Sequence, residues 1–241
     1  MSSRFEQIDI LRGSLFIPMF IFHLFSFYDL TNNFRTDYSS SPYIKYFGYV
    51  RTIYIILAGY SLYLSYKSNE SNKDKTAVDF YKNRFKRSLI IGFFAFLISL
   101  LSHYLYPNYG IKFGILHFIA FSTLLISPIA HLNLPIVTLI LFIVTCFWKI
   151  PSFGPIIDTI TGARVHYSTA DWFPLNKNLS YILFGLLISQ VGNKYLPPFE
   201  TNNAVGKVFK FMGKHSLQLY NIHFFIIMIV YYILKNKINI K

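Results

Sequence analysis

The sequence predicts an all-α, polytopic integral membrane protein with about seven transmembrane helices in a single domain over residues 1–241. Of the 241 residues, 54% are hydrophobic and only 14% are charged, and the mean hydropathy is +0.41. The apolar residues are gathered in long blocks separated by polar segments, which is the pattern of helices that cross a bilayer. The composition excludes an ordinary soluble domain, in which about 25% of residues are charged.

Seven apolar runs are the candidates for membrane-spanning helices, because about 20 apolar residues cross the hydrocarbon core. They cover residues 8–30, 47–66, 88–106, 113–130, 134–149, 179–191 and 216–234. The fifth and sixth runs are short, so a re-entrant segment stays open for either. No small-residue cleavage site follows the first run, which favours a retained helix over a signal peptide. In the second run, Gly59 and Ser61 would let a neighbouring helix approach closely.

The polar segments predict the orientation of the chain. The loop over residues 67–87 carries seven basic residues, more than any other connection. Because basic loops are retained in the cytoplasm, this loop predicts a cytoplasmic N-terminus. The other polar segments are a connector at 31–45, a long break at 150–178 and a basic linker at 194–215.

Net charge and cysteine content limit the partners and metals that the chain is expected to bind. The net charge of +13 lies mainly in those connections, where lysine and arginine set the topology and contact anionic lipid heads. Nucleic acid is not expected as a partner, because the basic residues form no clustered face. Cys146 is the only cysteine, and no apolar run carries histidines at i and i+4, so no metal is predicted. The bilayer is the expected partner, and a homo-oligomer stays open.

The first run carries the strongest functional signal, a histidine inside an apolar helix. His23 is costly to place in lipid, so it is expected to face a protein interior or a wet cavity. The eleven steps from Arg12 to His23 return to nearly the same helix face and rise about 16 Å, which places the imidazole near mid-membrane. Asp9 lies three residues before Arg12, close enough to pair with it. These three residues are the predicted catalytic set.

The other histidines divide into two groups. His103, His131 and His166 are interpreted as interfacial residues or as residues satisfied by a neighbouring carbonyl or hydroxyl. His117 and His223 are evenly balanced between that structural role and a functional one.

Four stretches in order resemble one family. They are IDILRG at 8–13 with His23 beyond it, FGILHFIAFSTLL at 113–125, DWFPLNKNLSYILFGLLI at 171–188 and GKHSLQLYNIH at 213–223. Together they resemble the bacterial-type proteins related to the catalytic domain of heparan-α-glucosaminide N-acetyltransferase, over nearly the whole chain.

The resemblance implies acyl transfer by a membrane enzyme. An acyl-coenzyme A, with acetyl-coenzyme A first among the candidates, would donate from the cytoplasmic side to a hydroxyl or amine, often on a sugar. By this likeness His23 corresponds to the first-helix histidine thought to act in catalysis, and Arg12 and Asp9 to its entry motif. The other motif positions are His117, Asp171, His215, Ser216 and His223.

The chain departs from the family pattern in three places. Residues 176–178 stand where Pro and Trp usually continue the third motif. Phe224 and Phe225 follow His223 where Gln-Pro is common, and Ala120 occupies a position more often held by glycine. Heparan sulfate as the acceptor therefore does not follow from the resemblance.

The residue chemistry leaves two mechanisms open for His23. A neutral imidazole can remove a proton from the acceptor as it attacks the thioester. It can instead take the acyl group itself, in a ping-pong reaction. The residues expected to bind the phosphates of coenzyme A are Arg12, Arg84, Lys86 and Arg87. The residues expected to bind the small-molecule or glycan acceptor are His117, Asp171, Trp172 and His223.

A non-enzymatic function is the alternative. A small transporter or a degenerate membrane scaffold would show the same intramembrane histidine and basic loops. An enzyme should bind an acyl-coenzyme A and release free thiol, whereas a transporter should accumulate substrate without coenzyme A.

Overall fold

The computed structural model describes residues 6–31, 41–72, 74–163, 171–192 and 203–238. Most of the polar connector expected at 31–45 lies outside these residues, as do Lys73, His166 and part of the basic linker. Within the described residues the backbone forms helices and no strands, so the predicted all-α class is confirmed. Phe113 and Trp172 pair in a single isolated bridge.

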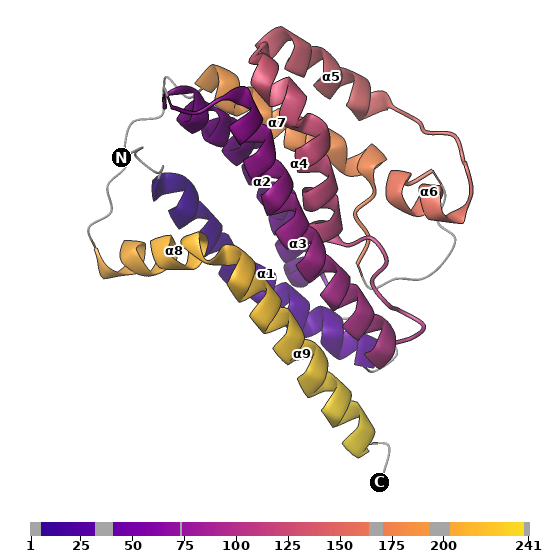
Figure 1. The fold of residues 1–241 in the computed structure, drawn as a ribbon. Helices are drawn as coiled ribbons and strands as arrows, with labels where there is room; N and C mark the ends of the chain where they lie inside the picture. The colour runs from indigo at the N-terminus through magenta and orange to yellow at the C-terminus, as the bar shows by residue number, and fades with distance from the viewer. Residues whose placement is uncertain (1–5, 32–40, 73, 164–170, 193–202, 239–241) are drawn as a thin grey trace. The chain divides into compact units, whose positions relative to one another are not determined.

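Nine helices follow one another along the described chain (Figure 1). They are α1 (Glu6–Thr31), α2 (Pro42–Glu70), α3 (Ala77–Leu105), α4 (Ile115–Leu132), α5 (Pro135–Phe147), α6 (Pro155–Thr161), α7 (Leu175–Gly192), α8 (Ala204–Lys214) and α9 (Ser216–Ile238). Each of the seven predicted apolar runs is helical over most of its length. The short helices α6 and α8 were not predicted.

Local signals account for the helix ends. Asn133 ends α4 in the left-handed conformation, with φ of 52°, and Pro135 begins α5 two residues later. Gly162 ends α6 with φ of 85°, which a glycine adopts without strain. At the start of α8, the Asn203 side chain accepts a hydrogen bond from the Gly206 amide at 2.7 Å.

Four of the described helices are long and apolar enough to cross a membrane: α1, α3, α4 and α9. Helix α5 has only 13 residues, and α2 and α7 include polar and aromatic residues that lower their hydropathy. Several membrane-spanning helices are thus present, and the count of seven stays a prediction.

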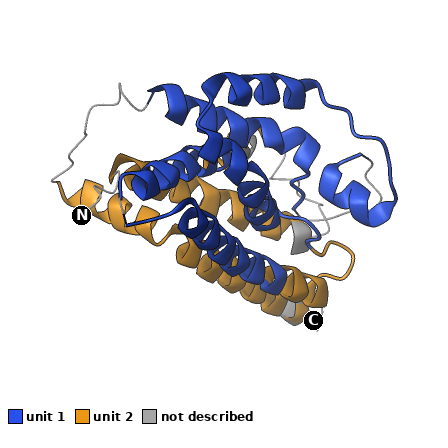
Figure 2. Ribbon diagram, turned by 45° about the horizontal axis from the view of Figure 1, so that its top comes forward, with its two compact units in different colours: residues 1–3, 55–97, 111–197 blue, residues 4–54, 98–110, 198–241 orange. Residues whose placement is uncertain are grey.

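The chain falls into two compact units, each made of segments distant in sequence (Figure 2). Unit 1 comprises residues 1–3, 55–97 and 111–197, and unit 2 comprises residues 4–54, 98–110 and 198–241. Helices α2 and α3 each contribute to both.

In unit 2, α1 packs against α8 and α9 (Figure 1). A Cβ placed on Gly13 would lie 1.9 Å from the carbonyl oxygen of Phe209, and a Cβ on Gly213 only 1.6 Å from that of Asp9. The two helices therefore touch backbone to backbone, and only glycine fits at these positions. The same turn of α1 carries Asp9 and Arg12, so this crossing fixes the start of the predicted catalytic stripe.

In unit 1, α2 and α7 make a reciprocal glycine contact. A Cβ on Gly59 would lie 1.9 Å from the carbonyl oxygen of Ile182, and a Cβ on Gly185 would lie 1.9 Å from that of Ile56. The close helix approach predicted at Gly59 is confirmed. Helix α7 also packs against α4, α5 and α6.

Candidate active site around His23

Helix α1 carries the three predicted catalytic residues, and the structure places all three in unit 2. Asp9 is 3% exposed and lies 3.7 Å from the Arg12 guanidinium. The carboxylate therefore holds the arginine one turn above it. The Tyr54 hydroxyl, from α2, donates a hydrogen bond to the Arg12 carbonyl at 2.7 Å. Neighbouring residues thus position both the guanidinium and the backbone carbonyl of Arg12.

His23, the third predicted catalytic residue, forms a pair with a second histidine. Nδ1 of His23 lies 2.8 Å from Nε2 of His223, which α9 contributes, and the two rings stack with centroids 5.1 Å apart. The side chains are buried, with 8% and 6% exposed. A hydrogen bond between two buried imidazoles is a strong polar contact.

The backbone determines which nitrogen of each ring carries the proton. Nδ1 of His223 lies 2.9 Å from the carbonyl oxygen of Leu219, and a carbonyl can only accept, so this Nδ1 is protonated. In the neutral ring Nε2 of His223 then accepts a hydrogen bond, and Nδ1 of His23 donates it. The lone pair of His23 is left on Nε2. This is the nitrogen that a general base uses.

Aromatic rings surround the pair. Phe16 and Phe20 lie edge-on to His223, with centroids 5.1 and 5.7 Å away. Tyr220 and Phe224 lie edge-on to His23 at 5.7 and 5.0 Å. These rings exclude water from most of the imidazole surface, and a hydrogen bond in such surroundings is stronger than in water.

Arg51 is a charged residue near the pair that the sequence did not indicate as a site residue. Its guanidinium lies 5.1 Å from the centroid of Phe22, and its charge acts on the neighbouring His23. The available signal was an arginine inside the second apolar run, because an ionisable residue there is by default functional. His223 had a similar signal, but its partner lies 200 residues away in the sequence.

Three of the predicted acceptor-binding residues lie in unit 1, near the start of α4. Asp171 accepts a hydrogen bond from the Ile115 amide at 3.1 Å, so it caps the helix. Trp172 donates its indole N–H to the Thr159 carbonyl at 2.8 Å. His117 lies in the first turn of α4, with its ring 5.8 Å from that of Phe113. The structure gathers these residues and also gives Asp171 and Trp172 structural roles. The fourth, His223, lies in the histidine pair of unit 2.

The basic residues expected to help bind the donor are on α3. Lys86 and Arg87 are exposed, and Arg84 is half-buried. All three belong to unit 1, whereas Arg12 belongs to unit 2. In the part of the chain that the structure describes, no group of three or more His, Cys, Asp or Glu side chains could hold a metal ion.

A helical protein with several membrane-spanning helices and a buried, hydrogen-bonded histidine pair belongs to the class of integral membrane proteins with polar chemistry inside the helix bundle. The family model described as heparan-alpha-glucosaminide N-acetyltransferase, catalytic, matches residues 4–225. The chain belongs to this family, and the resemblance drawn from the four motifs is confirmed. Comparisons with curated proteins and with solved structures gave no match.

Proposed function

We propose that the protein transfers an acyl group, acetyl first among the candidates, from an acyl-coenzyme A to a hydroxyl or amine acceptor within the membrane. The observation that supports this most directly is the hydrogen bond from His23 to His223, which leaves the His23 Nε2 lone pair in place for a base. Family membership supports an acetyltransferase class. The donor, the acceptor and the side of the membrane are part of the proposal.

The proposed reaction conserves every atom. His23 Nε2 removes the proton from the acceptor oxygen or nitrogen, which attacks the thioester carbonyl carbon. The tetrahedral oxyanion then collapses, the carbon–sulfur bond breaks, and the thiolate takes the proton from His23. His223 donates no group to the substrate in this scheme. It stabilises the protonated His23 by accepting from its Nδ1–H.

The positive charge of Arg51 is suited to stabilising the oxyanion. An oxyanion is stabilised most by charges already fixed in a site that excludes water. Arg51 is half-buried, lies over the Phe22 ring and acts on His23, so its charge is held beside the base. Arg12, oriented by Asp9, would bind a phosphate of the donor, and Arg84, Lys86 and Arg87 would add to the attraction of a polyanion.

Acceptor recognition is proposed for the cluster at the start of α4. Lys177 lies 5.8 Å over the indole of Trp172, so a sugar ring would have to displace this lysine or use the other face. Asp171 already accepts a hydrogen bond from the Ile115 amide. A polar acceptor with several hydroxyls fits such a cluster better than an apolar one.

Thiol release from acetyl-coenzyme A tests the function. The purified protein is incubated with acetyl-coenzyme A and a panel of amino sugars and sugar alcohols, and free thiol is measured with a chromogenic disulfide. We expect His23→Ala to lose acceptor-dependent release. His103→Ala is the matched control, because His103 is an exposed histidine in the same unit, and it should keep the wild-type rate.

Release that is unchanged in a normally folded His23→Ala protein would exclude His23 as the base. Absence of release with any acyl-coenzyme A, together with uptake of a solute into vesicles, would favour a transporter. Mass spectrometry without acceptor separates the two mechanisms, because ping-pong transfer leaves an acyl group on His23 and direct transfer does not.

A further inference from the structure

A second polar cluster lies within unit 1, where α2 ends, α3 begins and α4 ends. It consists of His131, Arg84 and the aromatic residues Tyr66, Phe80 and Tyr81. Tyr66 and Tyr81 both stack on the imidazole of His131, with centroids 5.6 and 5.4 Å away and ring planes 30° and 29° apart. Phe80 is 2% exposed and meets His131 edge-on at 6.3 Å. The imidazole is thus fixed by three aromatic rings.

Arg84 joins this cluster through the same phenylalanine. Its guanidinium carbon lies 5.9 Å from the centroid of Phe80. The Nε of Arg84 and the Nδ1 of His131 are buried, and neither has a hydrogen-bond partner among the described residues. A buried donor without an acceptor is costly, and the cost is larger when the donor is charged. Nε of Arg84 is such a donor, and Nδ1 of His131 is one in the tautomer that carries a proton there. Glu70, whose charge acts on His131, already accepts from Lys67 and Tyr66. An acceptor from outside the chain would satisfy both nitrogens.

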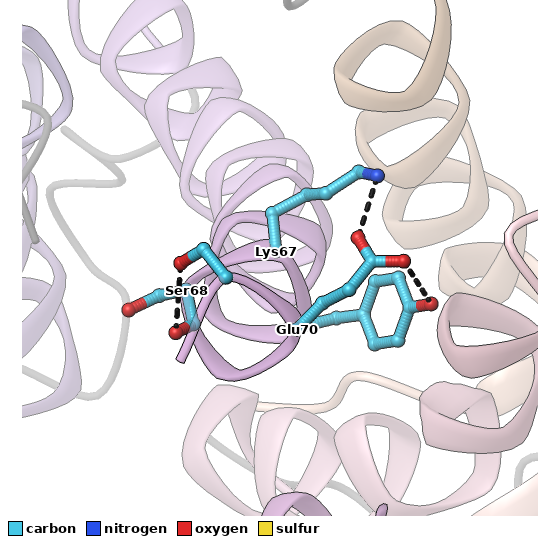
Figure 3. A network of polar contacts seen from close by, with 5 residues as sticks. Lys67, Ser68 and Glu70 are labelled. Atoms are coloured by element: carbon cyan, nitrogen blue, oxygen red, sulfur yellow. Dashed lines mark hydrogen bonds and ion pairs between the residues drawn. The ribbon is translucent and has the colours of Figure 1, made fainter. Parts of the chain in front are cut away.

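The charges around Arg84 make that acceptor an anion. Arg87 lies one turn further along α3 and acts on Arg84 as a like charge, which an anion would relieve. The acidic side chains nearest in the helix ends already have partners. Glu70 accepts hydrogen bonds from Lys67 at 2.7 Å and from Tyr66 at 3.1 Å (Figure 3), and Asp79 accepts from the Thr76 amide and hydroxyl.

The position along α3 agrees with a phosphate. The apolar part of this membrane-spanning helix follows directly after Arg87. Arg84 therefore lies at the level where an apolar span gives way to the polar headgroup region, and basic residues at this level bind lipid phosphates. The planar guanidinium presents parallel donors that match a phosphate group.

We propose that Arg84 and His131 bind a phosphate ester at this end of unit 1, either the headgroup of an anionic phospholipid or a soluble ester such as coenzyme A. The guanidinium of Arg84 supplies charge-assisted hydrogen bonds, and the imidazole of His131 supplies one more. The aromatic rings hold both groups and lower the local dielectric. The coenzyme A form of this proposal extends the donor-binding role proposed above for Arg84. Binding at this cluster requires no acyl transfer, so a binding measurement tests it independently of the enzyme activity.

Thermal stability of the purified protein in detergent tests the site, because a ligand that binds the folded state raises the Tm in a concentration-dependent way. The probes are dioleoyl phosphatidylglycerol, coenzyme A without an acyl group, and inorganic phosphate. We expect one of the first two to raise the Tm of the wild type. Arg84→Gln should weaken the apparent affinity about tenfold or more, since a hydrogen bond to a charged group is lost.

Two further variants and a control complete the test. Arg84→Lys keeps the positive charge but loses the parallel donors of the guanidinium, so it should weaken binding less than Arg84→Gln. His131→Asn should also weaken binding, in a protein that retains Arg84. Lys75→Gln removes one exposed positive charge just before α3 and should bind as the wild type does. A shift with the phospholipid alone assigns the site to lipid, and a shift with coenzyme A alone assigns it to a soluble ester. No shift with any probe, or the same shift in wild type, Arg84→Gln and His131→Asn, would overturn the proposal.

Discussion

At the scale of single residues, His223 sets the chemistry available to His23. The carbonyl of Leu219 fixes the proton on Nδ1 of His223, and that proton in turn fixes the tautomer of His23 through a 2.8 Å contact. A base whose tautomer is fixed by a second group is oriented before the substrate arrives. The histidine pair is therefore a unit of two residues, with different roles for each.

Replacing His223 should show whether this residue orients His23 or binds the substrate. We expect His223→Ala to lower kcat about 10- to 100-fold with little change in the KM for acetyl-coenzyme A, because the base loses its orienting partner while the donor site is intact. His223→Gln should keep more activity than His223→Ala, since the amide oxygen can still accept from His23. Equal losses in both variants would mean that His223 contacts the substrate itself, as the sequence suggested.

The ion pair at the end of α2 gives a prediction for pH. The hydrogen bond from Lys67, followed by that from Tyr66, lowers the pKa of Glu70, and the Glu70 carboxylate raises the pKa of Lys67. A carboxyl with a lowered pKa stabilises the folded state above its unfolded value, about 4.3, and this contribution is lost as the pH falls through the folded pKa. The pair is exposed, so it contributes about 0.5 kcal/mol or less.

The corresponding measurement is the Tm of Glu70→Gln against that of the wild type over a range of pH. The variant should be slightly less stable at neutral pH. The difference should shrink as the pH falls below the unfolded value and should vanish once the pH is below the lowered pKa of Glu70 in the folded state. Lys67→Met should lose a similar amount, and the double variant little more, because both changes remove the same interaction. Additive losses would show that the two side chains act separately.

At the scale of helices, the crossings are set by glycines that no side chain can replace. Gly213 lies against the backbone of Asp9, and Gly59 lies against the backbone of Ile182. Each contact holds a helix that also carries site residues or packs beside them. A shift of α8 along α1 would move the turn that holds Asp9 and Arg12.

Alanine at these crossings should be strongly destabilising. We expect Gly213→Ala and Gly59→Ala to cost about 1–3 kcal/mol or more, because the added methyl group would overlap a carbonyl oxygen and force the helices apart. Gly92→Ala is the control, since its Cβ would meet only the Ala120 methyl group at an ordinary 3.9 Å. That change should be neutral or stabilising, as alanine favours a helix over glycine by about 1 kcal/mol. Heat-induced loss of monodisperse protein in detergent measures the difference.

Apolar runs were sufficient to predict seven of the described helices, because length and hydropathy are properties of the local sequence. They did not predict α6, which has only seven residues, begins at Pro155 and is followed by Gly162. In the sequence α8 reads as part of a basic linker, because its lysines lie between the apolar residues Val205, Val208 and Phe211. The close approach at Gly59 was predicted from residue size, but its partner depended on tertiary packing.

At the scale of the whole molecule, the candidate site combines contacts within one helix, which the sequence predicts, with contacts between helices, which it does not. His23, Arg12 and Asp9 lie on one helix, so their spacing in the sequence predicts their relative positions, and the predicted pairing of Asp9 with Arg12 is confirmed. The contact of His23 with His223 joins α1 to α9, and the positions of Arg51 and Tyr54 depend on α2. None of these long-range contacts leaves a local pattern. The family motifs pointed to His223 as a site residue without giving its partner.

The orientation of the chain is the last prediction and depends on its basic loops. The loop between α2 and α3 should be cytoplasmic, and the turn between α3 and α4 should lie on the opposite side, because basic residues are retained in the cytoplasm and α3 is long enough to cross the bilayer. In a Cys146→Ser background, single cysteines are introduced as Lys75→Cys and Asn108→Cys, both at exposed positions. A membrane-impermeant maleimide added to intact cells should label Asn108→Cys and label Lys75→Cys only after lysis. Labelling of Lys75→Cys in intact cells would reverse the orientation, and it would place the Asp9–Arg12 end of α1 on the side away from cytoplasmic coenzyme A.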